Sequence, residues 1–128
     1  MAATAELAAL VIDCADPEPI AAFYQLACGG EIIHRDADSA WVTVGAMTVI
    51  FRQVAGYRPP TWPAEDVPVQ LHFDFFVDDL TAAQARLCEY GATVAEYQPG
   101  RADGLLVLLD PAGHPFCIAA RQQQAAAE

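Results

Sequence analysis

Hydrophobic and polar positions along the chain predict a strand followed by an amphipathic helix. The segment LAALVIDC alternates too little for a half-exposed strand, so residues 7–13 are predicted to form a strand covered on both faces. Asp16 can cap the free amides of a helix whose first residue is Pro17. The helix carries one apolar stripe with i, i+3, i+4, i+7 spacing, made of Ile20, Phe23, Tyr24 and Ala27. Gly29 and Gly30 are predicted to end it.

Three short strands and an irregular segment come next. EIIHR, SAWVTV and MTVIFRQV have strand composition and are separated by Asp-rich or Gly-containing turns. Residues 55–68, with GYRPPTWP among them, are rich in proline. Because proline lacks a backbone donor, this segment is predicted to be a linker or a covering loop.

The same order of elements then recurs. VQLHFDFFV is predicted to be a strand, Asp78 or Asp79 a helix cap, and Gly91 the end of the helix. The apolar stripe of this second helix consists of Leu80, Ala83, Leu87 and Cys88. Further strands are predicted at ATVAEY, LLVLL and HPFCIA, with a turn in the DPAG sequence between the last two.

This internal repeat predicts an α+β fold made of two βαβββ modules in one domain. Each module alone is too small to bury both a helix stripe and a sheet face, so we expect the two to share a core. The predicted organisation is a single domain over residues 1–128, with module one at 5–54, a covering loop at 55–68, module two at 69–120 and a frayed tail at 121–128.

Composition and charge narrow the class of function. The chain is 55% hydrophobic, yet it contains no apolar run of the ~18 residues that a spanning helix needs, and its start lacks the basic residues of a secretory signal. A cytoplasmic protein with no membrane partner is therefore expected, and its four cysteines should stay reduced. The net charge of −11 would repel a phosphate backbone, so nucleic acid is not expected as a partner.

Three motifs resemble those of a known superfamily. VIDCADPEPIAAFY, LHFDFFVDDLTAA and LLDPAGHPFCI are similar to the vicinal-oxygen-chelate superfamily of glyoxalases, bleomycin-resistance proteins and extradiol dioxygenases, and within it to the glyoxalase-like domains. The resemblance implies that the paired modules curl two four-stranded mixed sheets around a cup. In the enzymes of the superfamily, four ligands inside this cup, usually His, Gln and Glu, hold a metal ion.

The ligand positions implied by the resemblance keep little of the superfamily's usual chemistry in this chain. They fall on Ala9, Val49, His72 and Cys117, of which only His72 keeps the usual chemistry. A hard divalent ion needs several oxygen or imidazole donors, so we predict no metal and no cofactor.

Other residues are expected to line the cup with His72. Strand alternation puts Asp74 and Phe76 on the same face as His72, and likewise puts Phe51 and Gln53 on the same face as Val49. His72 and Asp74 then have two possible roles. In the first, the pair orients a ligand or acts as acid and base; in the second, it is a structural hydrogen bond. Trp41 is either a lining residue or core, and Trp62, in the Pro-rich loop, needs cover from a ligand or a partner subunit. The predicted ligand-binding residues are His72, Asp74, Phe76, Trp41, Phe51, Gln53, Trp62 and Cys117.

These residues predict a non-metal protein of the resistance or sequestration type, which binds a small organic ligand in an apolar cup. The ligand is expected to be uncharged or aromatic, since apolar walls supply affinity and few polar groups set orientation. Two alternatives remain open: a metal-dependent lyase, isomerase or dioxygenase with a non-standard set such as His72, Asp74 and a third inward residue, and a structural homodimer without a ligand. A homodimer is expected in each case.

Overall fold

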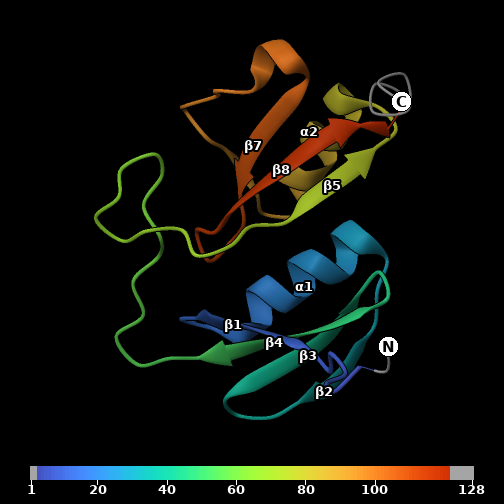
Figure 1. Cartoon of the computed structure of the whole chain (residues 1–128), viewed down its shortest axis with the longest axis vertical. Helices are drawn as coiled ribbons and strands as arrows, with labels where there is room; N and C mark the ends of the chain where they lie inside the picture. Colours follow the sequence, from blue (N-terminus) through green and yellow to red (C-terminus); the bar gives the residue numbers. More distant parts are fainter. Residues whose placement is uncertain (1–2, 122–128) are drawn as a thin grey trace. The chain divides into compact units, whose positions relative to one another are not determined.

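The computed structural model describes residues 3–121, which fall in two compact units with the same order of elements (Figure 1). The first unit, Met1–Tyr57, contains β1 (Leu10–Cys14), α1 (Pro17–Cys28), β2 (Ile32–Arg35), β3 (Ser39–Val44) and β4 (Met47–Gln53). The second unit, Arg58–Glu128, contains β5 (Asp74–Val77), α2 (Leu80–Glu89), β6 (Thr93–Val94), a short 3-10 helix (Arg101–Asp103), β7 (Leu105–Leu109) and β8 (Pro115–Ala120). The predicted α+β class and the repeated βαβββ order are confirmed. The predicted frayed tail lies outside the described residues beyond Arg121.

Each unit has one mixed, open sheet of four strands. The first sheet has the order β1-β4-β3-β2, with β1 parallel to β4 and the other pairs antiparallel. The second sheet has the order β5-β8-β7-β6, with β5 parallel to β8. The strand that precedes each helix therefore pairs in parallel with the last strand of its own unit.

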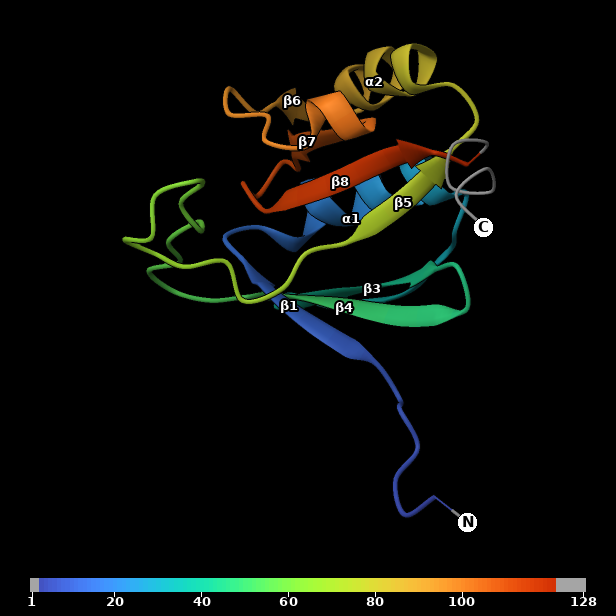
Figure 2. The same ribbon diagram turned by 45° about the horizontal axis from the view of Figure 1, so that its top comes forward.

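Helix α1 begins and ends where the sequence predicts. The Asp16 side chain accepts a hydrogen bond from the Glu18 amide at 3.1 Å, and Gly29 ends the helix with a left-handed φ of 67°. The helix packs on β3 and β4 and covers one face of the first sheet (Figure 2). There the Tyr24 ring stacks on Phe51, with 5.5 Å between ring centroids, so that both rings belong to the core.

The second unit buries the corresponding face of its own sheet. Asp79 caps α2 by accepting from the Ala82 amide at 2.8 Å. Phe116 and Ile118 of β8 are almost fully buried, and the Phe116 ring meets Phe75 of β5 edge to face at 5.9 Å. The side chains that alternate with these on β5 and β8 therefore point to the opposite face.

Strand β5 is shorter than the predicted strand over residues 69–77. In its register with β8, Asp74 lies beside Cys117, so His72 would lie beside Pro115. Proline has no backbone N–H to donate, which ends the ladder before His72. The Cys117 amide still donates to the Phe73 carbonyl at 2.9 Å and keeps the preceding segment against β8.

Strand β6 is also shorter than predicted, because a side chain replaces part of the ladder. The Gln98 amide group donates to the Ala95 and Val107 carbonyls and accepts from the Val107 amide, all within 2.8 Å.

The prolines and Thr61 explain the irregular segment before β5. Thr61 exchanges hydrogen bonds with the backbone of Val67 and closes the loop on itself.

In the described part of the chain, every helix is too short or too polar to cross a lipid bilayer.

Candidate functional site

Three donor side chains gather on the second sheet, on the face opposite Phe116 and Ile118, called here the distal face of the second sheet. His72 Nε2 lies 3.2 Å from Asp74 Oδ1, and Cys117 lies beside Asp74 in register. One donor atom from each of the three residues falls within 4.8 Å of the others. The structure thus brings together His72 and Asp74, which alternation placed on one face, and adds the Cys117 thiol to them.

The electrostatics of this trio keep the thiol protonated. Burial raises the pKa of Cys117, and the negative charge of Asp74 and a hydrogen bond to its carboxylate raise it further. A thiol that donates to a carboxylate is a poor nucleophile. The trio therefore offers a ligand an imidazole, a carboxylate and a thiol as hydrogen-bonding groups.

An apolar hollow of about 250 Å³ adjoins the trio on the same face. Phe76, Ala119 and Leu105 lie side by side across three strands and form its apolar part. Phe76 is 51% exposed although it is aromatic, which is the state expected of a side chain that awaits a ligand or another surface. The Arg121 guanidinium lies 5.6 Å from the Phe76 ring centroid.

The first sheet has a distal face of its own, opposite α1. The register places His34, Trp41, Ile50 and Val11 in one row across β2, β3, β4 and β1. In the next row the Arg52 guanidinium donates through Nε and Nη2 to Asp13 Oδ1, at 3.1 and 2.9 Å. This face therefore carries an apolar stripe, bordered by an ion pair in which the charges of Arg52 and Asp13 neutralise each other.

Two sequence predictions for β4 are wrong. Val49 and Phe51 were expected to face the cup, as Ala9 does, but both are fully buried on the α1 side. The parallel register pairs Leu10, not Val11, with Val49. Because a shift of one residue moves every side chain of a strand to the other face, Ile50 and Arg52 lie on the distal face instead.

The remaining predicted ligand residues lie apart from these rows. Gln53 is exposed at the end of β4, where its backbone amide donates to the Asp38 carbonyl. Trp62 is 38% exposed, and its ring centroid lies 6.0 Å from that of Tyr97 in the same unit. An aromatic neighbour thus covers part of Trp62 within the chain.

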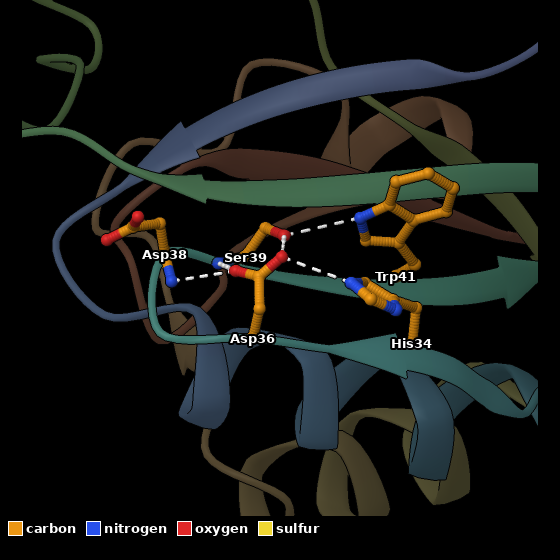
Figure 3. A network of polar contacts seen from close by, with 5 residues as sticks. All are labelled: His34, Asp36, Asp38, Ser39 and Trp41. Atoms are coloured by element: carbon orange, nitrogen blue, oxygen red, sulfur yellow. Dashed lines mark hydrogen bonds and ion pairs between the residues drawn. The ribbon is translucent and has the colours of Figure 1, made fainter.

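A network of polar contacts fixes Trp41 (Figure 3). The Trp41 indole Nε1 donates to Ser39 Oγ at 3.3 Å, and Ser39 Oγ donates to Asp36 Oδ2 at 3.1 Å. His34 Nε2 lies 3.1 Å from the same Asp36 oxygen, and its ring meets Trp41 at 5.2 Å. The sequence places His34 in a predicted strand but does not show this contact, which depends on the pairing of His34 in β2 with Trp41 in β3.

The network predicts an acid-dependent step in stability. Asp36 accepts from the Asp38 amide, from His34 and from Ser39, which lowers the pKa of its carboxyl from 3.8 to about 2. Since the folded pKa lies below the unfolded one, the stabilisation is complete above pH 3.8 and is lost as the pH falls toward 2. Carboxyl NMR titration should give the low value in the folded chain. Asp36→Asn should flatten this part of the stability profile, and an unchanged profile would contradict the assignment.

The metal set implied by the superfamily does not fit this chain. Ala9 has no donor atom, Val49 is fully buried beneath α1, and the Asp13 carboxylate on the distal face is already bound to Arg52. The first unit therefore supplies no ligand at these positions. Only the trio of the second unit offers several donors together among the residues described.

Comparisons with known proteins agree with this architecture. The chain is similar in structure to a glyoxalase/bleomycin resistance protein/dioxygenase family enzyme from Burkholderia phytofirmans PsJN, with a TM-score of 0.68 and 22% identity over 91% of this chain and 98% of that one. It is also similar to a point mutant of the fosfomycin resistance protein FosX from Listeria monocytogenes, a structure complexed with Mn(II) and 1S,2S-dihydroxypropylphosphonic acid. That match has a TM-score of 0.67 and 14% identity over 97% and 99% of the two chains.

A third similar structure is a glyoxalase-related enzyme from Fulvimarina pelagi, with a TM-score of 0.64 and 19% identity over 91% of this chain and 88% of that one. No curated protein matches the sequence. At these identities the structural matches show a common fold. The family model of the glyoxalase-like domain matches residues 9–119, nearly the whole described chain. The chain therefore belongs to the glyoxalase-like domain family, and its paired βαβββ units are those of the vicinal-oxygen-chelate superfamily.

Proposed function

We propose that the chain is a small-molecule binding protein of the resistance or sequestration type, which works without the divalent metal of its superfamily. Its ligand lies on the distal face of the second sheet, with an apolar part in the hollow beside Phe76 and a polar group at the His72–Asp74 pair. The observation that carries the proposal is this combination of an exposed apolar hollow with a few convergent polar groups.

The charge of the site favours an uncharged or aromatic ligand. FosX, which shares the fold, was complexed with a phosphonic acid and Mn(II). Here Asp74 borders the hollow and the chain carries a net charge of −11, so a phosphonate would be repelled unless a cation accompanied it. The missing donors of the first unit argue against such a cation.

A ligand screen on chelator-treated protein tests the proposal. Uncharged aromatic and alicyclic compounds are scored by the rise in melting temperature, because a ligand that binds only the folded state stabilises it. Hits should shift the NMR signals of Phe76, Leu105 and Cys117 in the metal-free protein. Hits that shift none of the three would show that the ligand face lies elsewhere.

A metal-dependent enzyme is the second candidate, and the geometry of the trio is the observation that favours it. An imidazole, a carboxylate and a thiol within 4.8 Å are a donor set that suits zinc better than a hard ion. Bound zinc would supply Lewis-acid chemistry at the edge of the hollow.

Cobalt substitution distinguishes the two candidates. From the leading proposal we expect no stoichiometric divalent metal after purification and no thiolate-to-cobalt absorption when Co²⁺ is added. A strong absorption that is lost in Cys117→Ser and kept in Cys28→Ser would reverse the order of the candidates. Cys28 is a suitable control because it is also half-buried and free, in the other unit.

We further propose that the protein acts as a cytoplasmic homodimer. Trp62 and Tyr97 remain 38% and 50% exposed although they contact each other, and an isologous interface would cover them. Sedimentation equilibrium at micromolar concentration should give twice the chain mass of 13.7 kDa. Trp62→Ser should shift the equilibrium toward the monomer, and a wild-type protein that sediments only as a monomer would rule the dimer out.

A further inference from the structure

The distal face of the first sheet carries a second aromatic feature that the trio of the second unit does not use. Trp41 is half-buried there, between His34 on one side and Ile50 on the other. With Val11, which is 49% exposed, the indole and Ile50 form an apolar strip across three strands. At the usual spacing of strands this strip is about 10 Å wide.

The indole of Trp41 is held in one orientation before any ligand arrives. Its N–H is bound to Ser39, Ser39 is bound to Asp36, and the second Asp36 oxygen accepts the backbone amides of Asp38 and Ser39 at 2.8 Å (Figure 3). The carboxylate is thus fixed from both sides, and it fixes the ring in turn. A ring that is already immobile loses less rotamer freedom when a ligand stacks on it.

The polar border of the strip selects the chemistry of that ligand. Asp13 neutralises Arg52 and takes two of the guanidinium's five N–H donors. The remaining donors suit a carbonyl or ether oxygen, whereas the neighbouring carboxylate disfavours an anion. A flat two-ring compound with an acceptor oxygen on one edge matches both the strip and its border.

We infer that Trp41 is a stacking platform for a planar, uncharged aromatic compound with an acceptor oxygen, and that Ser39 and Asp36 are its positioning residues. The inference rests on the proposed function, because it names the class of ligand, but it concerns residues of the other unit. Aromatic stacking and the acceptor contact with Arg52 are the interactions expected to give the preference.

NMR of the two indole N–H groups tests the platform. The chain has two tryptophans, so the spectrum of Trp62→Phe identifies the Trp41 signal. The probe is chromone, which is flat and carries a carbonyl, and the matched control is 2-decalone, which keeps two rings and a carbonyl but is neither flat nor aromatic. Chromone should shift the Trp41 signal saturably, and 2-decalone should bind at least about fivefold more weakly.

Variants separate positioning from folding. Ser39→Ala should weaken chromone binding about threefold or more and move the Trp41 indole signal in the free protein. Asp38→Ala is the matched control from the same turn: in Figure 3 its carboxylate points away from the network and only its backbone amide takes part, so binding should stay unchanged. Equal binding of the two probes, or equal effects of the two variants, would overturn the inference.

Two further outcomes are decisive. If chromone shifts only signals of the second unit, the platform is wrong while the proposed function stands. If the Trp41 signal instead shifts with protein concentration and not with chromone, a second copy of the chain occupies this face and the platform is again wrong. If chromone shifts the Trp41 signal and no signal of the second unit, the result supports the platform and contradicts the placement of the ligand in the hollow beside Phe76.

Discussion

Phe51→Ala is expected to lower the free energy of unfolding by about 3–5 kcal/mol, the usual cost of deleting a buried aromatic ring. Phe51 is fully buried and stacks on Tyr24, so alanine leaves a cavity between α1 and the first sheet. Denaturant unfolding followed by circular dichroism measures the loss. Ligand affinity at the second unit should not change in the fraction that remains folded.

Phe76→Ala is the matched control, with the same change of residue on a strand of the second sheet. The Phe76 ring is 51% exposed and lines the hollow. We expect a small change in stability together with weaker binding of the ligand. If instead Phe51→Ala impairs binding at unchanged stability, Phe51 contacts the ligand and its assignment to the core is wrong.

His72→Ala and Asp74→Ala should each weaken ligand binding by about 1–3 kcal/mol, roughly fivefold to 150-fold, because each leaves a polar group of the ligand without its partner. The pair lies on the distal face with exposed side chains, so little stability should be lost. Titration calorimetry with the best compound of the screen measures the affinity, and the melting temperature measures the stability.

Asp78→Ala provides the control for this pair. Asp78 is a nearly fully exposed carboxylate just after β5, and its contact with Arg121 is long, at 3.8 Å. Asp78→Ala removes one negative charge from this region, as Asp74→Ala does, but leaves the trio intact. If Asp78→Ala weakens binding as much as Asp74→Ala, the loss of a negative charge in this region is responsible and not the trio; if the His72 and Asp74 variants unfold the protein at unchanged affinity, the pair is a structural hydrogen bond.

Much of the fold could be predicted from local signals along the chain. Asp16 and Asp79 mark the starts of the two helices, and Gly29 ends the first, because caps depend on neighbouring residues alone. The face shared by His72 and Asp74 followed from alternation in the same way, since both lie in one extended segment.

What depended on pairing between distant segments could not be predicted. The face of Val49 and Phe51 follows from the register of β1 with β4, which a single strand does not encode. The early end of the ladder at His72 follows from Pro115, more than forty residues later. The contact of His34 with Trp41 and the ion pair of Arg52 with Asp13 are cross-strand contacts of the same kind.

Titration calorimetry of the best uncharged compound, with and without divalent metal, tests the central claim most directly. Chelator-treated protein should bind the compound at one site per chain, and Mn²⁺ or Zn²⁺ should leave the dissociation constant unchanged, because the first unit supplies no metal ligand at Ala9 or Val49. Binding that appears only after metal is added, and that His72→Ala abolishes, would contradict a non-metal binding protein.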